Sequence, residues 1–240
     1  SVHDVTTAVR TLALLGVESE DVTQALARKL ELEKSRQQRR LAQLIWPGEA
    51  LVRLPVNAGG FRGELALSGD HGEVTLAKDG VAVCHLVGAF PLGVVGVLDH
   101  PGLPVDETWT QAQPTAAQRA AIDALVDETF LALVPKVLGL SDRDRHLALE
   151  LVLRYLDWRG VREASQLSPR GHEVPALIAL PLLRTVDRRW VDLRAVADEV
   201  LKQGFVPVMA KTLFRPDVDG ALVLESEALD SPWLAELEAV

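Results

Sequence analysis

The sequence predicts an α+β protein, with a central, mainly antiparallel sheet flanked by helical hairpins and a smaller α/β portion at the C-terminus. Five short segments rich in Val and Leu follow one another between residues 49 and 111, and turn sequences containing Gly or Asp separate them. Segments with helical spacing and capping residues stand before and after this block. We expect three regions: an N-terminal helical arm over 1–48, the sheet with a helical pair over 49–165, and an α/β subdomain over 166–240.

The N-terminal region is predicted to be helical. Ser19 can cap a helix whose first turn carries Glu20 and Asp21, the charge sign that is favoured there, and Pro47-Gly48 is expected to end that helix. Residues 28–40 carry six basic and two acidic side chains, a local charge of +4. We interpret this stretch first as a solvated helix with i,i+4 ion pairs, and second as a surface that binds an acidic partner.

The sheet region is predicted to begin with a hairpin-rich set of strands at 50–56, 63–68, 72–77, 81–87 and 92–98. Asp79-Gly80 predicts a two-residue type I′ turn, since that turn requires positive φ at both positions. In the resulting register Lys78 opposes Val81 and Val74 opposes His85, which places His85 on an apolar face as a buried, hydrogen-bonded histidine. Both faces of the sheet are then largely apolar, so we expect helices to cover it.

Two helices are predicted to follow the sheet. Thr115 with Gln118, and Ser141 with Asp144, match the capping-box pattern that starts a helix. The first helix should end near Pro135. Both helices carry apolar residues at helical spacing, which is typical of elements packed on a core.

The C-terminal region mixes element types. The apolar run 174–183 is interpreted as a strand, and Asp192 is predicted to cap a helix that Gly204 ends. Two more strands are expected at 205–211 and 221–226, with a terminal helix from Ser231.

Composition excludes several function classes. The net charge of −9 argues against a general nucleic-acid binder, whose affinity rests on neutralising phosphates. Cys84 is the only cysteine, which excludes a disulfide or a cysteine-based zinc site within one chain. No apolar run approaches the ~20 residues of a membrane helix, and the N-terminus lacks a signal-peptide pattern. We expect a cytoplasmic protein without membrane span, metal or cofactor.

The acidic stretch after the last strand is the one candidate for catalysis. Asp99, His100, Asp106 and Glu107 lie within a few residues of one another and could line an enzyme site. Asp, Pro and Gly are also the residues that a strand uses to enter a turn, and no helical metal-ligand spacing is present. We favour the turn and keep a cytoplasmic enzyme with a site at these residues as the alternative.

Arginines cluster near Trp190, where they could recognise carboxylates or phosphates, or pair with neighbouring aspartates. The leading function is therefore a non-catalytic protein-interaction or regulatory scaffold module with a protein partner and a possible homo-oligomer. The residues predicted to bind are Arg28, Arg36, Arg39 and Arg40 on the arm, and Arg184, Arg188, Arg189, Trp190 and Arg194.

A family pattern is present in two stretches of the sequence. The stretches are GEVTLAKDGVAVCHLVGAFPLGVVGVLDHPGLPVDETWT and LPLLRTVDRRWVDLRAVADEVLKQGFVPVMAKTLFRPDVDGALVLES. A sheet that ends in a DHP-LP turn, followed later by a PL…T-D-RWV-L segment, resembles the region after the nucleotide-binding domain in large bacterial Hsp90-like (GHKL-type) ATPases. The family's Glu-x-x-x-Asn helix and Asp-x-Gly-x-Gly loop are missing, so no ATP-site residue is carried over. The resemblance implies a middle or C-terminal piece of a larger protein that binds ATP elsewhere.

Overall fold

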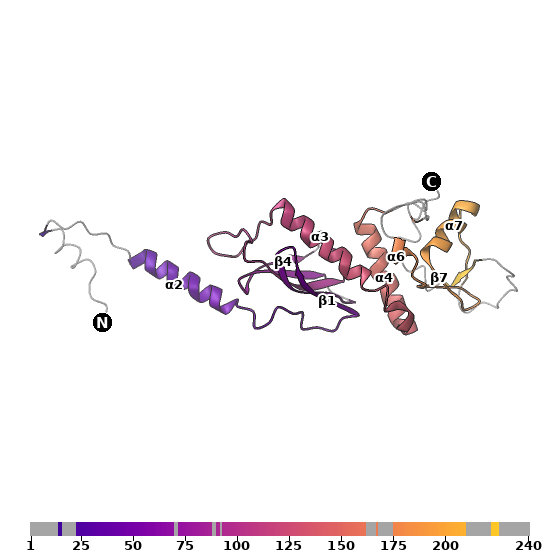
Figure 1. Ribbon diagram of the computed structural model, residues 1–240, viewed down its shortest axis with the longest axis horizontal. Helices are drawn as coiled ribbons and strands as arrows, with labels where there is room; N and C mark the ends of the chain where they lie inside the picture. Colours follow the sequence, from indigo (N-terminus) through magenta and orange to yellow (C-terminus); the bar gives the residue numbers. More distant parts are fainter. Residues whose placement is uncertain are drawn as a thin grey trace.

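The structure is a computed structural model that describes residues 14–15, 23–69, 72–87, 90–91, 93–161, 167, 175–209 and 222–225. Figure 1 shows a central sheet with α3 above it, the helix α2 projecting from one end, and α4, α6 and α7 at the other end. The described elements are α2 (Thr23–Gln38), β1 (Val52–Ala58), β2 (Phe61–Leu67), β3 (Glu73–Lys78), β4 (Val81–Val87), β5 (Val94–Asp99), α3 (Ala116–Leu131), the 3-10 turn η1 (Val137–Gly139), α4 (Asp142–Trp158), α6 (Pro175–Ile178), β6 (Leu183–Arg184), β7 (Trp190–Val191), α7 (Leu193–Gln203), β8 (Val208–Met209) and β9 (Leu224–Glu225).

The central sheet has the strand order β1-β2-β5-β3-β4. Three of its four neighbouring pairs are antiparallel, and β3 with β5 is parallel. All five predicted strands are present, with ends that differ by a few residues from those expected. The α+β class with a mainly antiparallel central sheet is therefore confirmed.

The β3–β4 hairpin follows the prediction at its turn and departs from it beyond the turn. Asp79 and Gly80 both have positive φ, 52° and 76°, and Lys78 pairs with Val81. The register then shifts, and Thr75 pairs with His85 instead of Val74. A β-bulge adds one residue to a strand and moves every later side chain to the other face. The expected Val74–His85 pair was therefore wrong.

As a result of the bulge, His85 is not a buried core histidine. Its side chain has 58% of its surface exposed to solvent. Its Nδ1 lies 2.6 Å from Glu73 Oε1 and 3.0 Å from Thr75 Oγ1. Cys84 takes the core-facing position and packs, partly buried, against the hydrophobic cluster.

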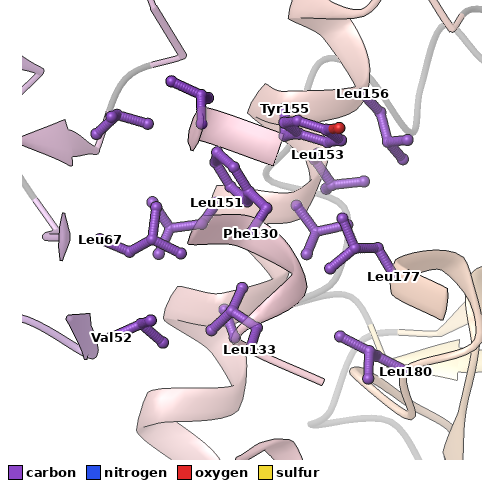
Figure 2. Close-up of a cluster of buried hydrophobic side chains, with 14 of the residues drawn as sticks. Val52, Leu67, Phe130, Leu133, Leu151, Leu153, Tyr155, Leu156, Leu177 and Leu180 are labelled. Atoms are coloured by element: carbon purple, nitrogen blue, oxygen red, sulfur yellow. The ribbon is translucent and has the colours of Figure 1, made fainter. Parts of the chain in front are cut away.

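One face of the sheet is covered by α3. Its N-terminus is a capping box between Thr115 and Gln118, as predicted, and the helix ends at Leu131, shortly before Pro135. Figure 2 shows Phe130 and Leu133 lying between the sheet residues Val52 and Leu67 on one side and α4 on the other. This layer holds the centre of the hydrophobic core.

The opposite face of the sheet is crossed by an extended segment, residues 39–50, rather than by a helix (Figure 1). The Leu41 N–H donates to Gly80 O at 2.9 Å, and the Trp46 N–H donates to Glu64 Oε1 at 3.2 Å. The Arg53 guanidinium donates a hydrogen bond to Trp46 O at 2.9 Å. We had expected the arm helix to run to Pro47, and that was wrong: α2 ends at Gln38 because the chain next pairs with the edge strand β4.

The C-terminal elements extend the same core. Ser141 accepts a hydrogen bond from the Asp144 N–H at the start of α4, as predicted, but the Asp144 carboxylate accepts from the Ser141 hydroxyl, so only half of the expected capping box is present. Asp192 caps α7, which ends at the left-handed Gly204, as predicted. Figure 2 places Leu151 and Leu153 of α4 between the sheet side and Leu177 of α6. The hydrophobic cluster is thus continuous from the sheet to the C-terminal elements, and the division into three regions stays a prediction.

The apolar run 174–183 does not form the single strand that we expected. Its first part is the helix α6, which begins at Pro175, and only Leu183 belongs to a strand, β6. Periodicity does not separate a buried strand from a buried helical turn in a short apolar run, and Pro is favoured at the first helical position. The predicted cap Ser19 and the terminal helix from Ser231 lie outside the described residues. None of the described helices is long and apolar enough to cross a membrane.

Candidate functional site

The basic arm, defined here as helix α2 (Thr23–Gln38), has a bare outer part. Residues 24–31 are all exposed. Leu26 and Leu30 keep 54% and 57% of their surface exposed, and their i,i+4 spacing places them on one side of the helix. Figure 1 shows the N-terminal end of α2 standing away from the body of the protein, while Arg28 lies 3.6 Å from the exposed carboxylate of Glu107. The outer arm therefore offers an uncovered apolar strip among charged residues.

Arg39, the residue that follows the arm, holds its inner end against the body of the protein. Its guanidinium donates to the carbonyl oxygens of Ala82 and Thr108, both at 3.1 Å, and to that of Trp109. Five donors in a fixed fork suit Arg to bind several carbonyls at once. Arg39 therefore joins the end of α2 to strand β4 and to the loop after β5.

Arg36 adds a second link from the arm to the same loop. It lies 4.4 Å from the centre of the Trp109 ring, and it donates to Glu107 O at 3.1 Å. Lys78 lies 5.3 Å from the same ring and donates to Leu103 O at 3.0 Å. Cation–π contacts of this kind orient an indole ring. Trp109 is half-buried beside these two cations.

The loop that receives the arm is organised by Asp106. Its Oδ1 accepts from the N–H groups of Thr110 and Gln111 at 2.7 and 2.9 Å, and its Oδ2 accepts from the hydroxyl groups of Thr108 and Thr110. The Thr108 hydroxyl, the Gln111 N–H and the other donors stabilise the ionised carboxyl, so the pKa of Asp106 is well below its usual range. Both oxygens of Asp106 are therefore engaged within its own loop.

Asp99 has an equally internal set of partners. It is fully buried, accepts from the Gly80 N–H at 2.8 Å, and accepts from Arg62 at 2.6 Å. This carboxylate thus ties the end of β5 to the β3–β4 turn. Strand β5 ends at Asp99 and a turn follows at residues 101–102, which is the arrangement that we favoured.

His100 joins that turn to α3. Its Nδ1 accepts from the Gly102 N–H at 3.0 Å and lies 3.4 Å from Gln118 Nε2, while its ring meets Phe61 edge-on at 4.8 Å. Gln118 also donates to Gly102 O at 3.1 Å. His100 and Gln118 therefore hold the turn after β5 against the start of α3.

The four residues of the alternative enzyme site are consequently engaged in different contacts. Glu107 is 87% exposed, and its carboxylate lies 3.6 Å from Arg28 of the arm. Within the residues that the structure describes, no group of three or more His, Cys, Asp and Glu side chains could hold a metal ion. The structure does bring the arm and this acidic stretch together, through Arg28, Arg36 and Arg39.

In the second arginine cluster, Arg184 and Arg189 form ion pairs within the chain, and Arg184 also contacts the Trp190 ring. Arg184 lies 5.8 Å from the Trp190 ring, donates to Asp142 at 3.1 Å, and lies 3.8 Å from Glu225. Arg189 pairs with Asp187, and Arg188 sits in the β6–β7 turn with φ 67°. Arg194 lies in the first turn of α7. Arg184 and Arg189 thus pair with aspartates of the same chain, which is the alternative that we set beside partner binding, and the binding role of the cluster stays a prediction.

Sequence reasoning missed Arg145, a buried arginine on α4. Its guanidinium lies 5.0 Å from the Trp190 ring and donates to Pro181 O and Leu138 O at 3.1 and 3.0 Å. One feature of the sequence could have indicated that Arg145 is buried. Arg145 stands three residues before Ala148 and four before Leu149, which places it on the apolar side of the helix. Arg145 positions Trp190 and joins α4 to the C-terminal elements.

We compared the chain with protein-family models and with curated proteins. No protein-family model matches the chain, and no curated protein matches it. The functional conclusion therefore rests on the geometry described above.

Proposed function

We propose that this chain is a non-catalytic protein-interaction module and that its binding element is the outer part of the basic arm. The observation that carries the proposal is the contrast along α2. Arg36 and Arg39 fix the inner end to the body, whereas Leu26 and Leu30 at the outer end are uncovered. A helix that is held at one end and bare at the other is preorganised for binding, because little conformational entropy is lost when a partner docks.

The chemistry of the outer arm favours a protein partner. Leu26 and Leu30 provide apolar contacts, and the exposed Arg28 and Lys29 beside them favour acidic groups. The cluster around Trp190 takes a secondary place in the proposal, since Arg184 and Arg189 already pair within the chain. The resemblance to Hsp90-like ATPases extends the proposal to a module of a larger ATPase that binds ATP elsewhere.

Site-specific photo-crosslinking in cells that produce the chain tests this function. A photoreactive residue in place of Leu26 should form adducts with protein, and the charge reversal Arg28→Glu with Lys29→Glu should abolish them. The matched control carries the photoreactive residue in place of Leu138, which is 80% exposed but lies on η1, away from the arm. Adducts from position 26 that are no more abundant than those from position 138 would refute the proposal.

A further inference from the structure

We infer that the partner of the basic arm is a second copy of this chain, with α2 of each copy lying on the outer face of α3 of the other. The inference rests on the proposed function, because it names the partner of the same arm. It also requires a receiving surface on the chain itself, of opposite charge and with apolar residues uncovered.

The charge distribution of the chain favours such a pair. The arm, residues 23–38, carries four basic and two acidic side chains and so a charge of +2, whereas the whole chain carries −9, so the remaining residues together carry −11. Two arms would repel each other, while one arm and the body of another copy attract. Each copy therefore provides both a basic binding element and an acidic partner for it.

The outer face of α3 has the complementary composition. Ala120 and Ala124 are exposed, and Leu131 on the same side of the helix keeps 44% of its surface exposed. The exposed carboxylates of Asp123 and Glu128 flank this strip. Small side chains let a second helix approach closely, and the two carboxylates meet the basic residues of the arm.

The arm cannot reach α3 of its own chain. Arg39 fixes its inner end beside Ala82 of β4, and α2 then runs away from the sheet, whereas α3 lies over one face of that sheet (Figure 1). Contact between α2 and this face of α3 is therefore between copies. Since each copy has one arm and one α3, a twofold dimer contains the contact twice.

Charge-reversal variants, studied by sedimentation velocity, test this inference. The wild-type chain should show the mass of two chains and dissociate as salt rises, because surface ion pairs are screened. The arm variant, Arg28→Glu with Lys29→Glu, and the α3 variant, Asp123→Lys with Glu128→Lys, should each weaken dimerisation about tenfold or more. An equimolar mixture of the two variants should restore the dimer, because both contacts between them again join opposite charges.

Matched controls separate this geometry from a general effect of net charge. The variant Lys136→Glu with Lys202→Glu makes the same charge change at two exposed positions outside the contact, and it should dimerise like the wild type. In a Cys84→Ser background, Leu26→Cys mixed with Ala124→Cys should form disulfide-linked dimers under mild oxidation. Leu26→Cys mixed with Leu138→Cys should not.

The outcomes distinguish this inference from the proposed function. A wild-type chain that keeps the mass of one chain at every concentration and salt refutes the second copy as partner, as does a dimer that neither reversal weakens. If the adducts from position 26 then persist in cells, the arm binds another protein and the proposed function stands. If those adducts are also absent, both proposals fall.

Discussion

Replacing Arg39 by Ala should destabilise the protein far more than replacing its neighbour Arg40. Arg39 is the link between the end of α2, strand β4 and the loop around Asp106. Arg40 is exposed, and only its backbone is paired with β4. The two substitutions remove the same charge from adjacent positions, so their difference isolates the contacts of the Arg39 guanidinium.

The expected magnitude follows from the bonds to the carbonyl oxygens of Ala82 and Thr108, both 3.1 Å long. Hydrogen bonds to a charged group contribute about 1.5–3 kcal/mol each, and Arg39 is only partly buried, so the lower value applies. Arg39→Ala should therefore lower the free energy of unfolding by about 3 kcal/mol. Arg40→Ala should change it by less than about 0.5 kcal/mol, as is usual for surface substitutions.

Urea unfolding followed by far-ultraviolet circular dichroism measures both values under the same conditions. Hydrogen exchange gives a local readout, because the amides of Thr110 and Gln111, which donate to Asp106, should lose protection in Arg39→Ala. If the two variants differ by less than about 1 kcal/mol, Arg39 does not anchor the arm in the way that its geometry indicates.

Three further predictions concern single positions. Gly96→Ala would place a Cβ 2.3 Å from Glu64 O within the sheet and should cost about 1–3 kcal/mol in thermal or urea unfolding, whereas Gly139→Ala, with open space around it, should be neutral. Folding lowers the pKa of Asp106, so the ionised carboxyl stabilises the fold above the unfolded pKa of about 4, and this contribution is lost as the pH falls below it. In unfolding experiments at a series of pH values, the difference in free energy of unfolding between the wild type and Asp106→Asn should therefore shrink below about pH 4. Burial raises the pKa of the Cys84 thiol, so iodoacetamide should alkylate Cys84 more slowly in the folded chain than in urea at the same mildly alkaline pH, and equal rates would contradict that burial.

The parts of the fold that were predicted correctly depend on neighbouring residues. The turn at Asp79-Gly80 needs positive φ at two adjacent positions, and the caps at Thr115, Ser141 and Asp192 each join side chains to N–H groups three residues on. Such contacts lie within a few positions, so they can be recognised from the order of residues alone. The β-bulge between Leu76 and Ala77, which moved His85 to the other face, leaves no comparable local pattern.

The candidate site shows the same limit. The charge of the arm and the turn after Asp99 were visible in the sequence, but the meeting of Arg39 with Thr108 joins residues 69 positions apart. The buried Arg145 is likewise satisfied by Pro181, 36 positions away. Sequence reasoning weighed partner binding against a solvated helix for the arm and against pairing with neighbouring aspartates for the Trp190 cluster, because the distant carbonyl partners cannot be recognised from the order of residues.

By itself, the sequence determined the class of the protein, the five strands of the central sheet and the starts of α3, α4 and α7, since alternation, helical spacing and capping are local properties of the chain. Tertiary structure decided where α2 ends, how the second face of the sheet is covered, and which arginines are engaged inside the protein. These outcomes depend on which distant carbonyl and carboxylate groups the folded core brings within hydrogen-bonding distance. Leu26 and Leu30 stay exposed because the contacts of Arg36 and Arg39 hold only the inner end of the arm against the body.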